Sequence, residues 1–417
     1  MKGRRQSDST DGDGKVMVSH RWAGSDRCRV LVVLALTLSP SLQQVGAVNE
    51  EPASERKSTE DFTFLAGRAA TAFQEGKTEE ALSLFRRGLQ LNPEWEEGWW
   101  YLGVLHYEAH QWKEAAKAFR VVTDLNPDMG PAWVMAGACQ YQLKKYYRAA
   151  DSIDRGLQAG LGGNAALRFS AFYHKAVLLT RIEEYERAFT ILYSLAKQQP
   201  TNEMVAAAMG LCILRIPLSP GETPSAWHPI VLETGRAFQS AAIQEEEQAR
   251  RKLEKLLEDH PDFPNLHYAF GQFLVSRGDP GAVEMFQREL ELNPYHIPAH
   301  LQLAWFYLNR GDAEKGLPFA EKARRLDPDS ASSYYVLGRI FLDRGRIDDA
   351  IEQLEAARER APESSQIRQF LARAYFRGGR REDARRELAE VDRLQRILQE
   401  REQGLILSGM GQDQPTP

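Results

Sequence analysis

One stretch of sequence decides the fold: WWYLG at residues 99–103, which returns as WVMAG at residues 133–137. Both copies begin with Trp and end with Gly, and they lie 34 residues apart. Pro93 and Pro127 share this spacing. A fixed period of this length indicates a repeat protein, in which each unit buries its apolar face against its neighbours.

The same period extends into the second half of the chain. There it separates Pro294 from Pro328 and Pro362, and it separates Ala304 from Gly338. Length alone would suggest two or three unlike domains for 417 residues. Because the period resumes in phase, we expect instead an array of one kind of unit.

Each unit is predicted to be a hairpin of two helices. Trp99, Leu102 and Gly103 are spaced to share one face of a first helix. Ala115 and Phe119 are spaced to do the same on a second helix. An Asn-Pro or Asp-Pro pair ends most hairpins, because the residue before proline disfavours the helical region and proline donates no hydrogen bond.

This pattern resembles the tetratricopeptide repeat, in which aromatic residues, Leu-Gly, Ala, Phe, Ala and Pro follow one another within 34 positions. The resemblance implies an all-α fold, a right-handed superhelical solenoid of helix-turn-helix repeats. Nine units can be placed, at residues 62–95, 96–129, 130–163, 169–202, 230–263, 264–296, 297–330, 331–364 and 365–398. They form a first block of four repeats (62–202) and a second block of five (230–398), whose last unit is a polar cap.

Several segments fall outside these units. Residues 203–229 contain one apolar helix and then a proline-rich loop, which predicts a half-repeat that is either a hinge or a packed insertion. Residues 48–61 are expected to be a linker. Residues 399–417 are expected to be a frayed C-terminal tail.

The N-terminus has the features of an export signal. Two arginines precede a nine-residue apolar run at 30–38, and small residues at 45–47 offer a cleavage site. We expect a signal peptide within residues 1–47, beginning at about Met17, and therefore a periplasmic or secreted protein of the bacterial type. The run is shorter than the roughly 20 residues of a membrane-spanning helix, so an uncleaved anchor is the weaker alternative.

Composition argues against several classes of function. The net charge is −5, whereas a nucleic-acid binder needs a basic excess to neutralise phosphates. Cys28, Cys139 and Cys212 are too scattered for a disulfide framework or a Cys-x-x-Cys metal site. The last two lie in apolar helical segments and are expected to be core residues.

Neither a catalytic site nor a cofactor or metal site is predicted. His106 and His110 flank Glu108, but zinc proteases place the Glu directly after the first His. His106 also stands where the repeat has a core aromatic residue, so we expect a packed histidine. A zinc enzyme built on these three residues is an alternative that metal analysis would test.

Binding is expected on the first helices, which line the concave side of such a solenoid. The predicted groove is aromatic with a basic end, and its residues are Phe73, Trp100, Tyr107, Tyr141, Tyr173, Tyr268, Trp305, Tyr335, Arg339, Arg373, Phe376 and Arg377. Aromatic residues and Arg are common anchors of protein interfaces, and Arg pairs with carboxylates. These residues predict a partner segment that carries acidic groups near one end.

We therefore expect a non-catalytic scaffold or adaptor that binds other proteins or peptides. Two alternatives stay open. One is a helper subunit that presents substrates to a separately encoded transferase or protease, which copurification of that enzyme would favour. The other is a self-assembling envelope protein, in which the groove or the array ends mediate self-association and give a concentration-dependent mass.

Overall fold

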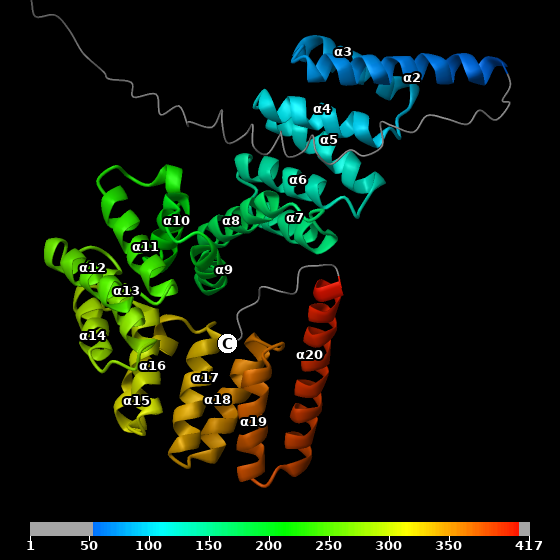
Figure 1. The fold of residues 1–417 in the computed structure, drawn as a ribbon. Coiled ribbons are helices and arrows are strands. Elements are labelled where there is room, and N and C mark those ends of the chain that lie inside the picture. The colour runs from blue at the N-terminus through cyan, green and yellow to red at the C-terminus, as the bar shows by residue number, and fades with distance from the viewer. Residues whose placement is uncertain (1–52, 408–417) are drawn as a thin grey trace, which may run out of the picture. The chain divides into compact units, whose positions relative to one another are not determined.

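A computed structural model of the chain describes residues 53–407 (Figure 1). Within this range the regular structure consists of the α-helices α2 to α20 and one short 3-10 turn, and no β-strand occurs. The all-helical solenoid predicted from the sequence is confirmed. The signal peptide predicted within residues 1–47 lies outside the described residues.

Four hairpins make up the first block. They are α2 (Ala53–Gln74) with α3 (Thr78–Leu91), α4 (Glu96–Glu108) with α5 (Trp112–Leu125), α6 (Gly130–Gln142) with α7 (Tyr146–Ala159), and α8 (Ala165–Arg181) with α9 (Tyr185–Gln198). Each helix packs against its hairpin partner and against the next helix in the chain, which is the arrangement of a solenoid.

The second block follows after α10 (Glu203–Ile213) and the 3-10 turn η2 (Pro220–Glu222). Its hairpins are α11 (His228–Ala242) with α12 (Glu246–Asp259), α13 (Leu266–Val275) with α14 (Ala282–Leu292), α15 (Ile297–Asn309) with α16 (Ala313–Leu326), α17 (Ala331–Asp343) with α18 (Ile347–Arg360), and α19 (Ser365–Arg377) with α20 (Arg381–Leu407). None of the described helices is long and apolar enough to cross a membrane.

Two predicted boundaries are wrong. Helix α2 begins at Ala53, so much of the expected linker is helical. Helix α20 runs to Leu407, so the first part of the expected tail is helical too. The reason is local: no proline or glycine interrupts 53–66, and no proline interrupts 381–407, so both segments can continue a helix whose other end is fixed by packing.

Small residues bring the two helices of a hairpin together, as the sequence pattern predicts. A Cβ atom on Gly103 of α4 would lie 2.8 Å from the ring of Phe119 on α5. Ala115 and Ala149, at equivalent positions of successive second helices, are both fully buried. The aromatic ring of one helix therefore occupies the space that a larger side chain would need on the other.

Every hairpin turn contains one residue in the left-handed region, at the same position of each unit. Glycine fills this position in the first unit and in the last four, at Gly76, Gly278, Gly311, Gly345 and Gly379. Four middle units use other residues there, namely His110, Lys144, Glu183 and Gln244, with φ between 58° and 67°. Non-glycine residues adopt this conformation at a cost, so the turn is imposed by the packing of its two helices.

Residues 203–213 form helix α10, which packs against the hairpin that follows it. Helix α10 packs along α11 so closely that a Cβ on Gly210 would lie 1.8 Å from the carbonyl oxygen of Val231. The contact is reciprocal, since a Cβ on Gly235 would lie 1.8 Å from the carbonyl oxygen of Ala206. Both helices contribute to one hydrophobic core that is continuous from Tyr173 to Leu303, so the segment is a packed insertion.

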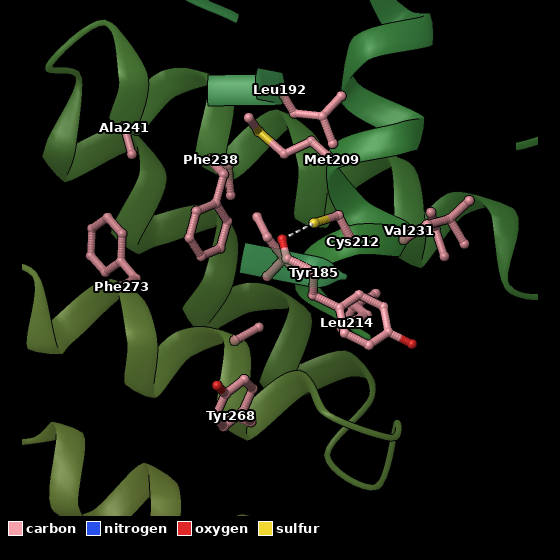
Figure 2. Packing of buried hydrophobic residues seen from close by; sticks show 14 of the residues in the cluster. Tyr185, Leu192, Met209, Cys212, Leu214, Val231, Phe238, Ala241, Tyr268 and Phe273 are labelled. Carbon is pink, nitrogen blue, oxygen red and sulfur yellow. Dashed lines mark hydrogen bonds between the residues drawn. The ribbon is translucent and has the colours of Figure 1, made fainter. Parts of the chain in front are cut away.

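Figure 2 shows this core around α10. The Cys212 thiol donates a hydrogen bond to the carbonyl oxygen of Tyr185 on α9, with a sulfur–oxygen distance of 3.2 Å. Burial raises the pKa of Cys212 to about 12, so the thiol stays protonated and unreactive. The interpretation of Cys212 as a core residue is confirmed, and Cys139 is fully buried as well.

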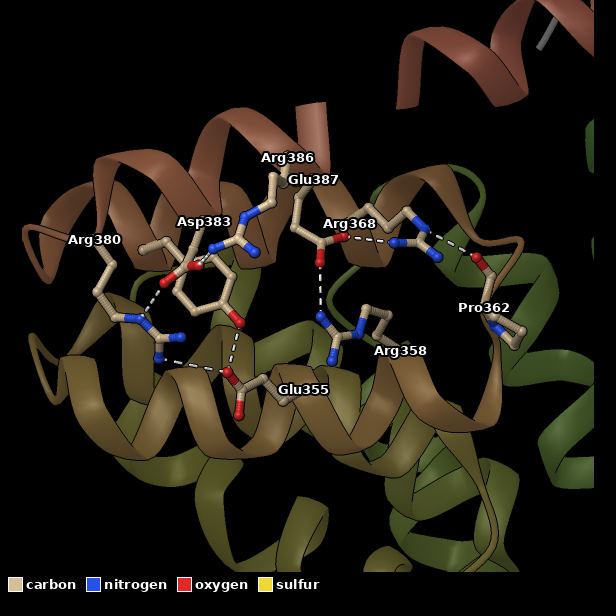
Figure 3. Close-up of polar contacts among 9 residues, drawn as sticks. Glu355, Arg358, Pro362, Arg368, Arg380, Asp383, Arg386 and Glu387 are labelled. Carbon is tan, nitrogen blue, oxygen red and sulfur yellow. Dashed lines mark hydrogen bonds and ion pairs between the residues drawn. The ribbon is translucent and has the colours of Figure 1, made fainter. Parts of the chain in front are cut away.

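The last helix is fastened by a carboxylate that bridges two arginines (Figure 3). Glu387 of α20 is buried, and its two oxygens lie 2.7 Å from Nη1 of Arg358 on α18 and 2.6 Å from Nη1 of Arg368 on α19. Removing one partner from such a shielded bridge costs more than removing one from a surface pair, because a charge is left unpaired away from water. It joins three helices at the C-terminal end of the array.

We expect Gly210→Ala to destabilise the protein by about 2–3 kcal/mol, because the methyl group would force α10 and α11 apart. Gly67→Ala is the matched control: Gly67 is exposed on α2 and a Cβ added there would meet no atom of another element within 4 Å, so alanine should stabilise by roughly 0.5–1 kcal/mol. Urea unfolding followed by circular dichroism measures both. Equal midpoints for the two variants would contradict the close contact of α10 with α11.

Glu387→Gln is expected to cost about 2–4 kcal/mol, because it removes the carboxylate that forms ion pairs with the partly buried Arg358 and Arg368. Glu390→Gln removes a solvent-accessible carboxylate that forms an ion pair with Arg393 of the same helix, and should change thermal stability little. If thermal unfolding shows the same small shift for both variants, the Glu387 bridge does not hold the C-terminal cap.

Candidate protein-binding surface

Five of the twelve predicted groove residues are buried and do not line an open surface. They are Trp100, Tyr107, Tyr173, Tyr268 and Tyr335. Their rings pack edge-on or tilted against neighbouring aromatic side chains, as for the ring centroids of Trp100 and Phe119, which are 5.4 Å apart. For these five residues the prediction that they line an open groove is wrong. An aromatic ring that is long enough to reach the neighbouring helix is covered by that helix.

The remaining seven residues are at least partly accessible. Phe73 and Tyr141 are half-buried and pack against the cores of their blocks. Trp305 and Arg339 are half-buried, whereas Arg373, Phe376 and Arg377 are exposed. Five of these seven residues therefore lie on the last three first helices: α15, α17 and α19.

Arg339 is the centre of this group. Its guanidinium carbon lies 5.2 Å from the ring centroid of Trp305 and 3.8 Å from that of Phe370. Trp305 belongs to α15, Arg339 to α17 and Phe370 to α19, so three successive repeats supply the contacts. A cation over an aromatic face gains about 0.5–2 kcal/mol, and here two rings hold one guanidinium in place.

Tyr335 contacts all three of these side chains from its buried position. Its ring centroid lies 5.4 Å from that of Trp305 and 5.8 Å from that of Phe370, and its hydroxyl lies 3.4 Å from Nη1 of Arg339. Burial raises the pKa of Tyr335, so the hydroxyl stays neutral. We call Trp305, Arg339, Phe370, Arg373 and Phe376 the Arg339 surface, beneath which the buried Tyr335 lies. Arg373 and Phe376 follow Phe370 at helical spacing on α19 and extend it.

The charge of this surface is uncompensated. Within the described part of the chain, neither Arg339 nor Arg373 forms an ion pair with a carboxylate, and Arg377 donates to the carbonyl oxygen of Leu342 at 2.6 Å. Helices α15, α17 and α19 contain a single acidic residue, Asp343. An approaching carboxylate would therefore meet positive charge and aromatic faces without a competing internal partner.

Sequence reasoning missed two residues of this kind. Phe370 was not predicted, although it stands three residues before Arg373 and hence on the same helix face. Arg181 was not predicted either, although it occupies the position in its unit that Arg377 occupies in the last one. Comparison of units position by position would have found Arg181. Phe370 needed the structure, because its ring is turned toward the neighbouring repeat.

The two histidines near α4 lie in different settings. His106 is buried and its Nδ1 is hydrogen-bonded to Gln111, which confirms the prediction of a packed histidine. His110 lies in the turn after α4, so it leaves the helix face on which His106 stands. Across residues 53–407 no group of three or more His, Cys, Asp or Glu side chains is placed to hold a metal ion.

His296 is a buried histidine of the second block whose protonation state affects a helix cap. It caps α15 by accepting a hydrogen bond at Nδ1 from the Ala299 amide, and its ring lies 4.8 Å from that of Tyr268. Burial, together with the charge of Arg215, lowers the pKa of His296 from 6.5 to about 4. The acceptor nitrogen is therefore free of its proton at neutral pH, as the cap requires.

We expect stability to fall as the pH drops from about 6.5 toward 4. In this window the unfolded chain binds a proton at His296 and the folded chain does not, which lowers the free energy of unfolding by about 1.4 kcal/mol per pH unit. His296→Asn keeps a capping acceptor but cannot titrate, so its unfolding free energy should depend less steeply on pH. Urea titrations at pH 4.5, 5.5 and 7 would show this, and equal slopes for both proteins would refute it.

Helix hairpins stacked in series, with an aromatic and basic surface on successive first helices, define a helical-repeat interaction protein. Residues 341–396 and 297–322 each match a tetratricopeptide repeat family, and residues 74–156 match the family described as anaphase-promoting complex, cyclosome, subunit 3. The chain is a tetratricopeptide repeat protein. Proteins of this class serve as scaffolds for protein interactions.

Solved structures give the following likenesses. MamA from Desulfovibrio magneticus RS-1, residues 41 to the end, is 24% identical over 40% of this chain and 94% of its own, with a TM-score of 0.37. Yeast Tom70 is 13% identical over 85% of this chain and 96% of its own, with a TM-score of 0.32. No curated protein matches the sequence.

Proposed function

We propose that this protein is a non-catalytic adaptor that is exported from the cytoplasm and binds an acidic segment of another protein on the Arg339 surface. One observation carries the proposal: Arg339 is held between Trp305 and Phe370 and has no carboxylate partner in the described chain. The predicted leader within residues 1–47 supports export.

The geometry of Arg339 favours recognition of a carboxylate. The two rings restrict the guanidinium before a partner arrives, so less side-chain entropy is lost on binding than for a free surface arginine. Its half-buried position also shields the pair from water and strengthens the attraction. A carboxylate from a partner would therefore gain more at Arg339 than at the many exposed arginines of α20.

The aromatic residues define the rest of the partner. Phe376 is 47% exposed at the edge of the surface, and Trp305 is half-buried. Such side chains anchor apolar groups at protein interfaces. A partner segment that matches this surface therefore carries one or more carboxylates beside an apolar or aromatic residue. The first helices of three successive repeats offer it an extended binding surface.

Peptides selected from a displayed random library against the purified chain are expected to be acidic. Arg373→Glu should weaken their binding about 10-fold or more, which corresponds to about 1.4 kcal/mol. Arg373 is exposed and forms no ion pair within residues 53–407, so the protein should stay folded. Arg385→Glu is the matched control: Arg385 lies on α20, the second helix of its hairpin, is exposed and likewise has no ion pair in that range, so this variant should bind normally.

Fluorescence anisotropy with the selected peptides gives the dissociation constants, and circular dichroism verifies folding. Peptides of no net charge that bind wild type, Arg373→Glu and Arg385→Glu equally would refute the proposal. In that case another face of the solenoid, or self-association, would be the site of interaction.

A further inference from the structure

The loop between α10 and α11 lies against the ends of earlier repeats. Arg181, the last residue of α8, donates a hydrogen bond from Nη1 to the carbonyl oxygen of Pro217. The same Nη1 lies 3.9 Å from a carboxylate oxygen of Glu222. Leu218 packs, with Tyr141 of α6, against the central core. We call residues 217–222 the internal segment.

Glu222 is the polar anchor of the internal segment. Its carboxylate accepts hydrogen bonds from the backbone amide and the hydroxyl of Ser219, at 3.0 Å and 2.6 Å. Burial alone would raise the pKa of Glu222, but the bonds from Ser219 and the charges of Arg181 and Lys144 hold it below its usual value. The carboxylate is therefore ionised and bound.

Three side chains of the first block receive this segment. Burial raises the pKa of Tyr141, and the neighbouring Ser219, which is only 3% exposed, partly offsets that rise. The guanidinium carbon of Arg181 lies 5.2 Å from the ring centroid of Tyr146, so an aromatic face orients the arginine that binds the segment. Arg181 thus has both an aromatic ring and a carboxylate partner. Arg339 has the aromatic rings but no carboxylate partner in the described chain.

The repeat register links the two surfaces. Tyr141 occupies the position in its unit that Phe376 occupies in the last unit, and Arg181 occupies the position of Arg377. Phe376 and Arg377 are exposed, whereas Tyr141 and Arg181 are partly covered. The same face of the repeat is therefore open at the C-terminal end and filled by the chain itself in the first block.

We propose that Tyr141, Tyr146 and Arg181 form a second segment-binding surface, that the internal segment is its tethered occupant, and that an extended, proline-containing acidic segment of another protein binds there in its place. The internal segment, with the sequence PLSPGE, is the template for the partner. It presents a backbone carbonyl and a carboxylate to Arg181 and an apolar side chain to the core.

Tethering determines when the second surface is available. A segment joined to its site by a short linker has an effective concentration of about 1 mM, so a free peptide of equal affinity competes only near that concentration. A partner must therefore bind more tightly than the internal segment, or the internal segment must be loosened first.

The test uses the full chain with residues 217–223 replaced by seven Gly and Ser residues, and a labelled peptide of residues 215–225 as probe. Wild type should bind the probe weakly, and the loop variant about 10-fold or more tightly, because the tethered competitor is gone. Adding Arg181→Ala to the loop variant should abolish the gain. Adding Arg187→Ala, at an exposed arginine of α9, should leave it intact.

A second variant guards against misfolding of the replaced loop. Glu222→Gln keeps the loop but removes its charge, so the probe should bind this variant several-fold more tightly than it binds wild type. A folded loop variant that binds the probe no better than wild type would overturn the proposal, as would a gain that survives Arg181→Ala. Because Arg373→Glu lies on the other surface, it should not change probe binding, which separates this result from failure of the Arg339 proposal.

Discussion

The close approach of neighbouring helices is the constraint on which the whole structure depends. Gly103 accepts the ring of Phe119, and Gly210 and Gly235 let two backbones touch. Only where a side chain is missing on one helix can an aromatic ring or a carbonyl group of the next helix fill the space. The period of small residues therefore fixes the distance between helices, and that distance fixes which side chains are covered.

Much of the fold could be predicted because it is written in local spacing. The 34-residue period, the proline after each hairpin and the small residues specify helix pairs without reference to distant parts of the chain. The central segment behaved differently. Whether α10 stands alone depends on the partner of Gly210, and that partner, Val231, lies beyond a proline-rich loop whose path the sequence pattern does not determine.

The candidate site could be predicted only in part, because exposure is a property of neighbours. Register predicts that Tyr335 and Arg339 both line the open groove, yet the former is buried and the latter is half-buried between rings from two other helices. Register gives the direction of a side chain from its own helix. It does not give the reach of Trp305 or Phe370 from the helices on either side.

The hairpin turns share one backbone conformation, but its free-energy cost differs in origin from turn to turn. A glycine such as Gly345 adopts the left-handed conformation without strain, but it also gives the unfolded chain more freedom to lose. Lys144 or Gln244 restricts the unfolded chain more and carries steric strain in the folded turn. In one part of the array the left-handed turn therefore costs chain entropy on folding, and in another part it costs steric strain in the folded state. The backbones of both parts follow the same path.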